Sequence, residues 1–181
     1  MPLLRKEPEI FPEDVFEARQ PWRVAHVRSR QEKVLARHLL QHGIAFYLPQ
    51  MERSIVRGGR RYTSHLPLFG GYVFFRGDAA ARQAALRSNV VARLMEVEDQ
   101  ALLNDELLQI RKLQLAGASL IPVVEFVAGD PVRIEEGAFA GYRGTVLRDA
   151  RGDRLLVSVS LLRKSVAVEF PRQVLKRQRT G

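Results

Sequence analysis

The sequence predicts an α+β protein: an N-terminal antiparallel sheet flanked by helices, linked to a small C-terminal β-barrel. Three observations lead to this fold class. Residues 21–117 mix strand-like and helix-like hydrophobic periodicity, as small α+β domains do. After Pro122 the helical patterns stop and short strands punctuated by glycine follow, a pattern typical of small barrels. Hydrophobic residues make up 46% of the 181 residues, which is enough for packed cores.

The chain is expected to contain four segments. Residues 1–20 combine prolines and charges without periodicity, so we expect them to be poorly ordered. Residues 21–117 form the α+β domain, and residues 118–124 form a short linker. Residues 125–178 form the barrel.

The first half of the α+β domain is predicted to contain two strands, a helix and a hairpin. Alternation predicts strands at 22–28 and 44–51, and the helix between them ends near Gly43. A hairpin is expected over residues 52–65, because Gly58-Gly59 supplies the positive φ that a tight turn needs.

The second half is predicted to contain an aromatic strand, two helices and a further strand. The aromatic strand covers residues 66–77, and a short helix begins after an Asp78 cap. A strand follows at 90–97, and the last helix is expected to begin at Asn104 and to stop at Gly117.

Four glycines in the stretch 129–146 raise the question of a phosphate-binding loop. Such a loop needs its glycines between a strand and a helix N-terminus, where backbone N–H groups face the anion. Here the glycines lie between two predicted strands, and Glu135 and Glu136 would repel phosphate. The stretch is therefore interpreted as strand, loop and strand.

The charge balance favours a polyanionic partner. Lys and Arg number 29 against 20 Asp and Glu, giving a net charge of +9, so nucleic acid is the first candidate. Ordinary solubilising charge is the alternative. The absence of cysteine excludes disulfides and thiolate sites. No signal peptide or membrane span is recognised, so a cytoplasmic location is expected.

The histidines do not suggest catalysis. His38 and His42 have the i, i+4 spacing of metal ligands, but no third ligand is evident. His26 and His65 have no serine and acid partners at a supporting spacing. We therefore expect no enzyme activity, no cofactor and no metal site.

Two groups of motifs resemble one protein family. The stretches "GDPVRI", "GAFAGYRGTV" and "LLVSVSLLRKSVAVEF" resemble the KOW motif of NusG-type transcription factors and some ribosomal proteins. The stretches "WRVAHVRSRQEK", "YLP" and "LPLFGGYVFF" resemble the NusG N-terminal domain, in the same order. The resemblance covers roughly residues 21–177 and is closer to specialised NusG paralogues. Gly70 departs from it, since the family usually has proline there, and Arg163 replaces a glycine.

The resemblance implies a non-enzymatic transcription elongation or antitermination factor with an SH3-like KOW barrel. Its first domain would bind RNA polymerase at the clamp coiled coil, near the DNA or RNA of the elongation complex. Its barrel would recruit a termination factor or a small-subunit ribosomal protein, and a monomer is expected. A KOW-containing RNA- or ribosome-binding protein remains the alternative.

Three sets of residues are candidate binding sites. The aromatic residues of the first domain would bind polymerase, although about half of them are expected to be core; they are Tyr47, Phe69, Tyr72 and Phe74. If no bulge intervenes, Phe69 and Phe75 share one face of their strand. The basic residues of the hairpin would contact nucleic acid; they are Arg53, Arg57, Arg60 and Arg61. In the barrel, Phe139 and Tyr142 could contact a recruited partner or fold over the barrel end.

Overall fold

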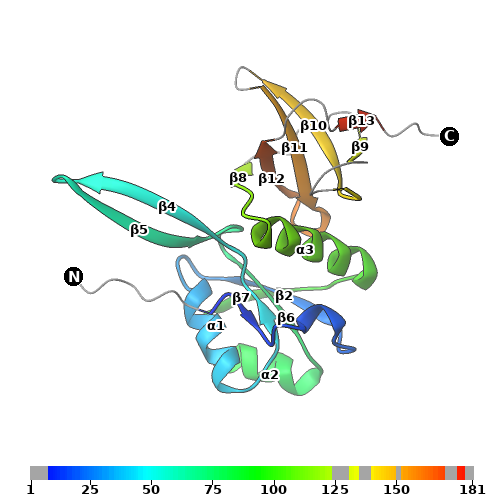
Figure 1. Ribbon diagram of the computed structural model, residues 1–181. Helices are drawn as coiled ribbons and strands as arrows, with labels where there is room; N and C mark the ends of the chain where they lie inside the picture. The colour runs from blue at the N-terminus through cyan, green and yellow to red at the C-terminus, as the bar shows by residue number, and fades with distance from the viewer. Residues whose placement is uncertain (1–7, 124–130, 135–139, 150–151, 170–174, 178–181) are drawn as a thin grey trace. The chain divides into compact units, whose positions relative to one another are not determined.

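A computed structural model of the chain describes residues 8–123, 131–134, 140–149, 152–169 and 175–177. It divides into two compact units, Met1–Gln100 and Ala101–Gly181. Each unit is built around an antiparallel sheet, and Figure 1 shows both sheets together with the three α-helices. The α+β fold class predicted from the sequence is confirmed.

The first unit contains a five-stranded antiparallel sheet. Its strands, in spatial order, are β1 (Ile10–Phe11), β3 (Phe46–Tyr47), β6 (Tyr72–Arg76), β2 (Trp22–Val27) and β7 (Val91–Met95). Because side chains alternate along a strand, each strand contributes residues to both faces of the sheet.

Helices α1 (Glu32–Gln41) and α2 (Ala79–Arg87) pack on one face of this sheet. Leu35 and Leu39 of α1 lie on one side of the helix and join the buried cluster, as residues four apart do. α1 is followed by Gly43 at φ +64°, a left-handed conformation that glycine adopts without strain. α2 begins as predicted, with the Asp78 carboxylate accepting a hydrogen bond from the Ala81 amide at 3.0 Å.

The opposite face carries Trp22, Tyr47 and Phe74, all of them buried. The short 3₁₀ helix η1 (Val15–Glu17) contributes to this face, because the Phe16 ring lies 5.9 Å from Trp22 and 5.3 Å from Tyr47. The expectation of a poorly ordered N-terminus therefore does not hold for residues 8–20, which pair through β1 and pack through Phe16. Residues 1–7 lie outside the described part of the chain.

Strands β4 (Gln50–Arg57) and β5 (Arg60–Pro67) form a separate two-stranded hairpin. The predicted Gly58-Gly59 turn is confirmed, with φ of +57° and +73°, as the favoured two-residue hairpin turns require. The hairpin is longer than predicted and takes Leu66 and Pro67 from the expected aromatic strand. Figure 1 shows it as a long two-stranded ribbon extending from the first unit.

The second unit contains a six-stranded antiparallel sheet and most of α3 (Gln100–Leu115). Its strands, in spatial order, are β13 (Leu175–Arg177), β9 (Pro131–Ile134), β10 (Arg143–Asp149), β11 (Gly152–Val159), β12 (Lys164–Glu169) and β8 (Leu120–Val123). Ladder pairing joins these strands as an open series within the described residues, so closure into a barrel stays a prediction.

Two segments differ from their sequence-based expectations. The predicted linker includes β8, which pairs with β12 through Val166↔Pro122 and its neighbours. Helix α3 begins at Gln100 rather than at Asn104. The Gln100 side chain accepts a hydrogen bond from the Trp22 amide at 2.6 Å and donates one to its carbonyl at 3.0 Å, which fixes the first turn of the helix.

Candidate functional site

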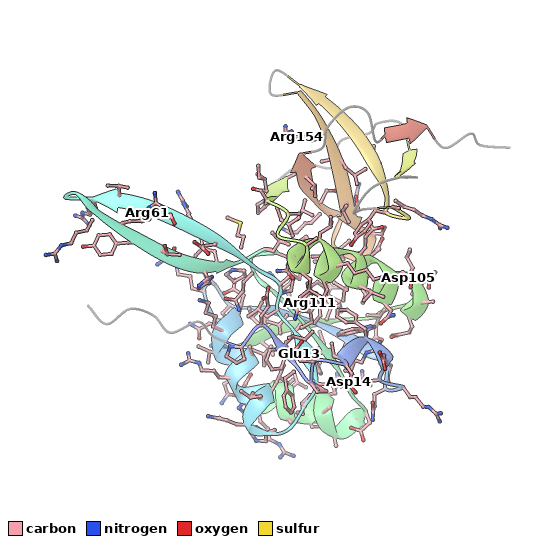
Figure 2. All side chains as sticks on the ribbon, in the orientation of Figure 1. Glu13, Asp14, Arg61, Asp105, Arg111 and Arg154 are labelled. Carbon is pink, nitrogen blue, oxygen red and sulfur yellow. The ribbon has the colours of Figure 1, made fainter. Side chains whose placement is uncertain are left out.

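The β4–β5 hairpin has two distinct faces. The register pairs Arg57 with Arg60, Ile55 with Tyr62, and Arg53 with Ser64. Cross-strand partners lie on the same face of an antiparallel pair, and positions two apart along a strand do too. These six residues therefore share one face, which we call the Tyr62 face. Figure 2 shows side chains projecting from both sides of the hairpin, with Arg61 labelled.

The Tyr62 face combines cations with an exposed apolar pair. Tyr62 is 47% exposed and Ile55 is 51% exposed, and both side chains lie directly opposite each other. Arg57 and Arg60 lie on the turn side of this pair and Arg53 on the other side, all three exposed. The face contains no acidic residue, so its charge is uniformly positive.

The opposite face, which we call the Arg61 face, is mostly polar. Its members alternate with those of the Tyr62 face and are Glu52, Ser54, Val56, Arg61, Thr63 and His65. The hydroxyl groups of Ser54 and Thr63 hydrogen-bond to each other at 3.1 Å. The predicted nucleic-acid residues are thus divided, because Arg61 lies on this face together with Glu52. Counting alternate positions outward from the Gly58-Gly59 turn would have predicted this division from the sequence.

The predicted polymerase-binding aromatics differ in exposure. Tyr47 and Phe74 are fully buried and Phe69 is 3% exposed, whereas Tyr72 is partly exposed. Phe69 makes an edge contact with Phe74 at 6.1 Å, so it does not lie with Phe75 as the sequence predicted for an unbroken strand. The strand begins only at Tyr72, because Gly71 adopts φ +87° and turns the chain just before it.

Tyr72 contacts His26, a neighbour that the sequence did not indicate. Its ring stacks on His26 at 5.0 Å with an interplanar angle of 29°. His26 is exposed and pairs across the sheet with Arg93 of β7, which is also exposed. Alternation along β2 does not predict the exposure of His26, because Trp22 and Val24 on the same face are buried. The stack with Tyr72 depends on the pairing of β2 with β6.

In the second unit, Tyr142 lies beside α3. The Gln109 side chain donates to the Arg143 carbonyl at 2.7 Å and accepts from its amide at 2.8 Å. Glu106 accepts from the Ser160 amide at 3.0 Å and from its hydroxyl at 2.5 Å. Tyr142 is 9% exposed, and this burial raises the pKa of its phenol. Phe139, the other predicted partner residue, lies outside the described residues.

An open groove of about 620 Å³ follows this side of α3 within the second unit. Asp105 and Lys112 line it from the helix, Tyr142 lines it from the loop before β10, and Ser158 lines it from β11. The sequence identified Tyr142 as a loop residue at the barrel end. It gave no indication that a helix assigned to the preceding domain would line a groove together with it.

His38 of α1 and His42, which follows the helix directly, have a structural role. His38 Nε2 lies 2.8 Å from the Ala84 carbonyl and joins α1 to α2, and the His42 ring lies 4.2 Å from the His38 ring. Within the described ranges there is no group of three or more potential metal-ligating side chains. No helix among the described residues is both long and apolar enough to cross a membrane.

The family model and the related sequences that match this chain agree with each other. The family model described as "Transcription termination factor nusG" matches residues 20–116. The transcription termination/antitermination protein NusG of Buchnera aphidicola is 31% identical over 137 residues, which cover 71% of this chain and 76% of the relative. The corresponding protein of Vibrio vulnificus is 28% identical over 161 residues, covering 78% of this chain and 85% of the relative.

Among solved structures, similarity extends to one titled "Domain interaction in Thermotoga maritima NusG". The TM-score is 0.48 at 21% sequence identity, and the match covers 88% of this chain and 97% of the other.

Proposed function

The chain belongs to the NusG family of transcription termination/antitermination factors, and on this premise we propose three roles for its surfaces. The first unit binds RNA polymerase, its hairpin contacts nucleic acid of the elongation complex, and the second unit recruits another factor. The protein acts as a cytoplasmic monomer without catalytic activity of its own.

The observation that carries this proposal is the exposed basic hairpin within the family-matched region. Arg53, Arg57, Arg60 and Arg61 are all exposed, and the segment between Glu52 and Asp78 contains no acidic residue. Exposed arginines bind phosphates and release counterions. The hairpin is therefore suited to contact DNA or RNA beside a polymerase on which the rest of the unit is bound.

Polymerase binding is assigned to the aromatic surface of the first unit. Tyr72 is its contacting residue, because it alone among the four candidate aromatics is partly exposed. Tyr47, Phe69 and Phe74 are buried and support it from within the unit. An exposed aromatic ring on a rigid sheet is a favourable anchor for a protein partner such as the polymerase clamp coiled coil.

Recruitment is assigned to the second unit, whose sheet we propose to close into a KOW barrel. Tyr142 and Phe139 are its proposed partner-binding residues. Tyr142 already lines the groove beside α3, so a termination factor or a small-subunit ribosomal protein would bind at or next to this groove.

A competition pull-down tests the proposed function. The full chain is immobilised and offered equal amounts of core RNA polymerase and small ribosomal subunits. The proposal predicts retention of polymerase, and Tyr72→Ala should reduce it at least about fivefold, as loss of a central aromatic anchor does. The exposed Arg82→Ala variant of α2 is the matched control and should bind normally. Retention of ribosomal subunits alone would contradict the proposal.

A further inference from the structure

We propose that the Tyr62 face of the hairpin binds an unpaired stretch of DNA. One base stacks on the Tyr62 ring, and the neighbouring phosphates contact Arg53, Arg57 and Arg60. This inference depends on the proposed contact between hairpin and nucleic acid, and it goes further by specifying which face binds and which state of the strand is recognised.

The register of the hairpin places a ring between cations on a single face. Tyr62 and Ile55 are cross-strand partners, as are Arg57 and Arg60 in the next same-face row. Successive same-face rows are about 6.6–6.8 Å apart along a strand, twice the rise per residue. Arginine side chains from the rows on either side can therefore reach phosphates that flank a base lying on the ring.

The exposure of the ring favours an unpaired base over a duplex. Tyr62 is 47% exposed and Ile55 is 51% exposed, so together they offer an apolar surface on which a flat base can lie. Base–aromatic stacking contributes substantially to single-strand binding and tolerates any sequence, because every base has a π-face. In a duplex those faces are occupied by neighbouring base pairs, which leaves only phosphates for the hairpin.

The charge of the face favours nucleic acid over a protein partner. Three arginines and no acidic residue belong to it, whereas the Arg61 face carries Glu52 and a hydroxyl pair bonded within itself. A contact made through a ring face and backbone phosphates needs no ribose 2′-hydroxyl, the group by which proteins distinguish RNA from DNA. We therefore assign DNA as the occupant.

The test uses the full chain and a short single-stranded DNA containing the fluorescent base 2-aminopurine, whose emission is quenched when it stacks. The inference predicts quenching on binding. Tyr62→Leu should abolish the quenching and weaken binding at least about fivefold, while Tyr62→Phe should retain both. Preserved quenching in Tyr62→Leu would overturn the stacking contact, and unchanged thermal unfolding of both variants shows that the fold is intact.

Two adjacent arginines provide a matched control for the choice of face. Arg60 lies on the Tyr62 face and Arg61 on the opposite one. Arg60→Ala should weaken binding by a clearly larger factor than Arg61→Ala. Equal losses would overturn the choice of face while leaving a hairpin contact in place, and no loss from either would remove the contact itself. Tighter binding of the matching duplex, or RNA bound more than about tenfold tighter than DNA, would overturn the assignment of unpaired DNA.

Discussion

The guanidinium carbon of Arg76 lies 4.3 Å from the centroid of the Trp22 ring. The two residues are cross-strand partners in β6 and β2. Arg76 also donates to the carbonyls of Gln20, at 2.6 Å, and Phe16, at 3.3 Å. One buried cation thus connects the centre of the sheet to the N-terminal segment, and its burial lowers the pKa of the guanidinium.

We expect Arg76→Ala to destabilise the first unit by about 2–4 kcal/mol. The substitution removes a cation–π contact and charge-assisted hydrogen bonds to two carbonyls. Urea unfolding followed by the fluorescence of Trp22, the only tryptophan, measures the change. Arg82→Ala, at an exposed position of α2, should change stability by less than about 0.5 kcal/mol. Equal stability of the two variants would contradict the role of Arg76.

Gly144→Ala is expected to disrupt the pairing of β10 with β11. An added Cβ would lie 2.3 Å from the Leu156 carbonyl oxygen and 2.8 Å from Leu155 Cδ1. Relieving such overlap requires the strands to separate, so we expect a loss of roughly 3 kcal/mol or more. Thermal unfolding by circular dichroism measures it. Gly70→Ala is the control, because no atom lies within 4 Å of its added Cβ; similar losses in both variants would refute the argument.

The side-chain hydrogen bonds from α3 to Arg143 of β10 and to Ser160 should be separable. Gln109→Ala removes the partner of the Arg143 amide, and Glu106→Ala removes that of the Ser160 amide. We expect each substitution to accelerate hydrogen exchange mainly at its own amide. NMR-detected exchange measures both sites in each variant. Unchanged exchange at Arg143 in Gln109→Ala would show that this hydrogen bond does not protect it.

The raised pKa of Tyr142 predicts a pH dependence for the second unit. A tyrosine whose pKa is higher in the folded state contributes stability below its unfolded pKa of about 10. That contribution is lost as the pH rises through the folded-state value, because ionisation favours the unfolded chain. We therefore expect stability to fall less steeply above about pH 10 in Tyr142→Phe than in the wild type. Parallel curves from urea unfolding would contradict this.

Local signals in the sequence predicted the elements that depend on local chemistry. The Gly58-Gly59 turn and the Asp78 cap are confirmed, because positive φ and capping are determined by a few adjacent residues. The Asn104 cap was wrong, since the Gln100 side chain is anchored to Trp22, a residue 78 positions away. No local pattern reports such a long-range hydrogen bond.

In the candidate sites, too, some features are set by adjacent residues and others by contacts between distant segments. The exposure of Arg60 and Arg61 follows from their position beside the Gly58-Gly59 turn, which the sequence predicted. The burial of Tyr47 and Phe69 depends on which segments cover them, Phe16 and Phe74 among them. The stacking of Tyr72 on His26 depends on the pairing of β6 with β2. These features required the paired strands to be seen, because alternation alone does not say which face is covered.

Direct titration of a reconstituted elongation complex with the full chain is the most direct test of the account. The complex is assembled from core RNA polymerase on a DNA–RNA scaffold, and binding is followed by fluorescence anisotropy for the wild type, Tyr72→Ala and Tyr72→Phe. The account predicts saturable binding, at least about fivefold weaker in Tyr72→Ala and retained in Tyr72→Phe. The absence of wild-type binding, or equal affinity of all three proteins, would contradict the claim that this chain acts on polymerase through Tyr72.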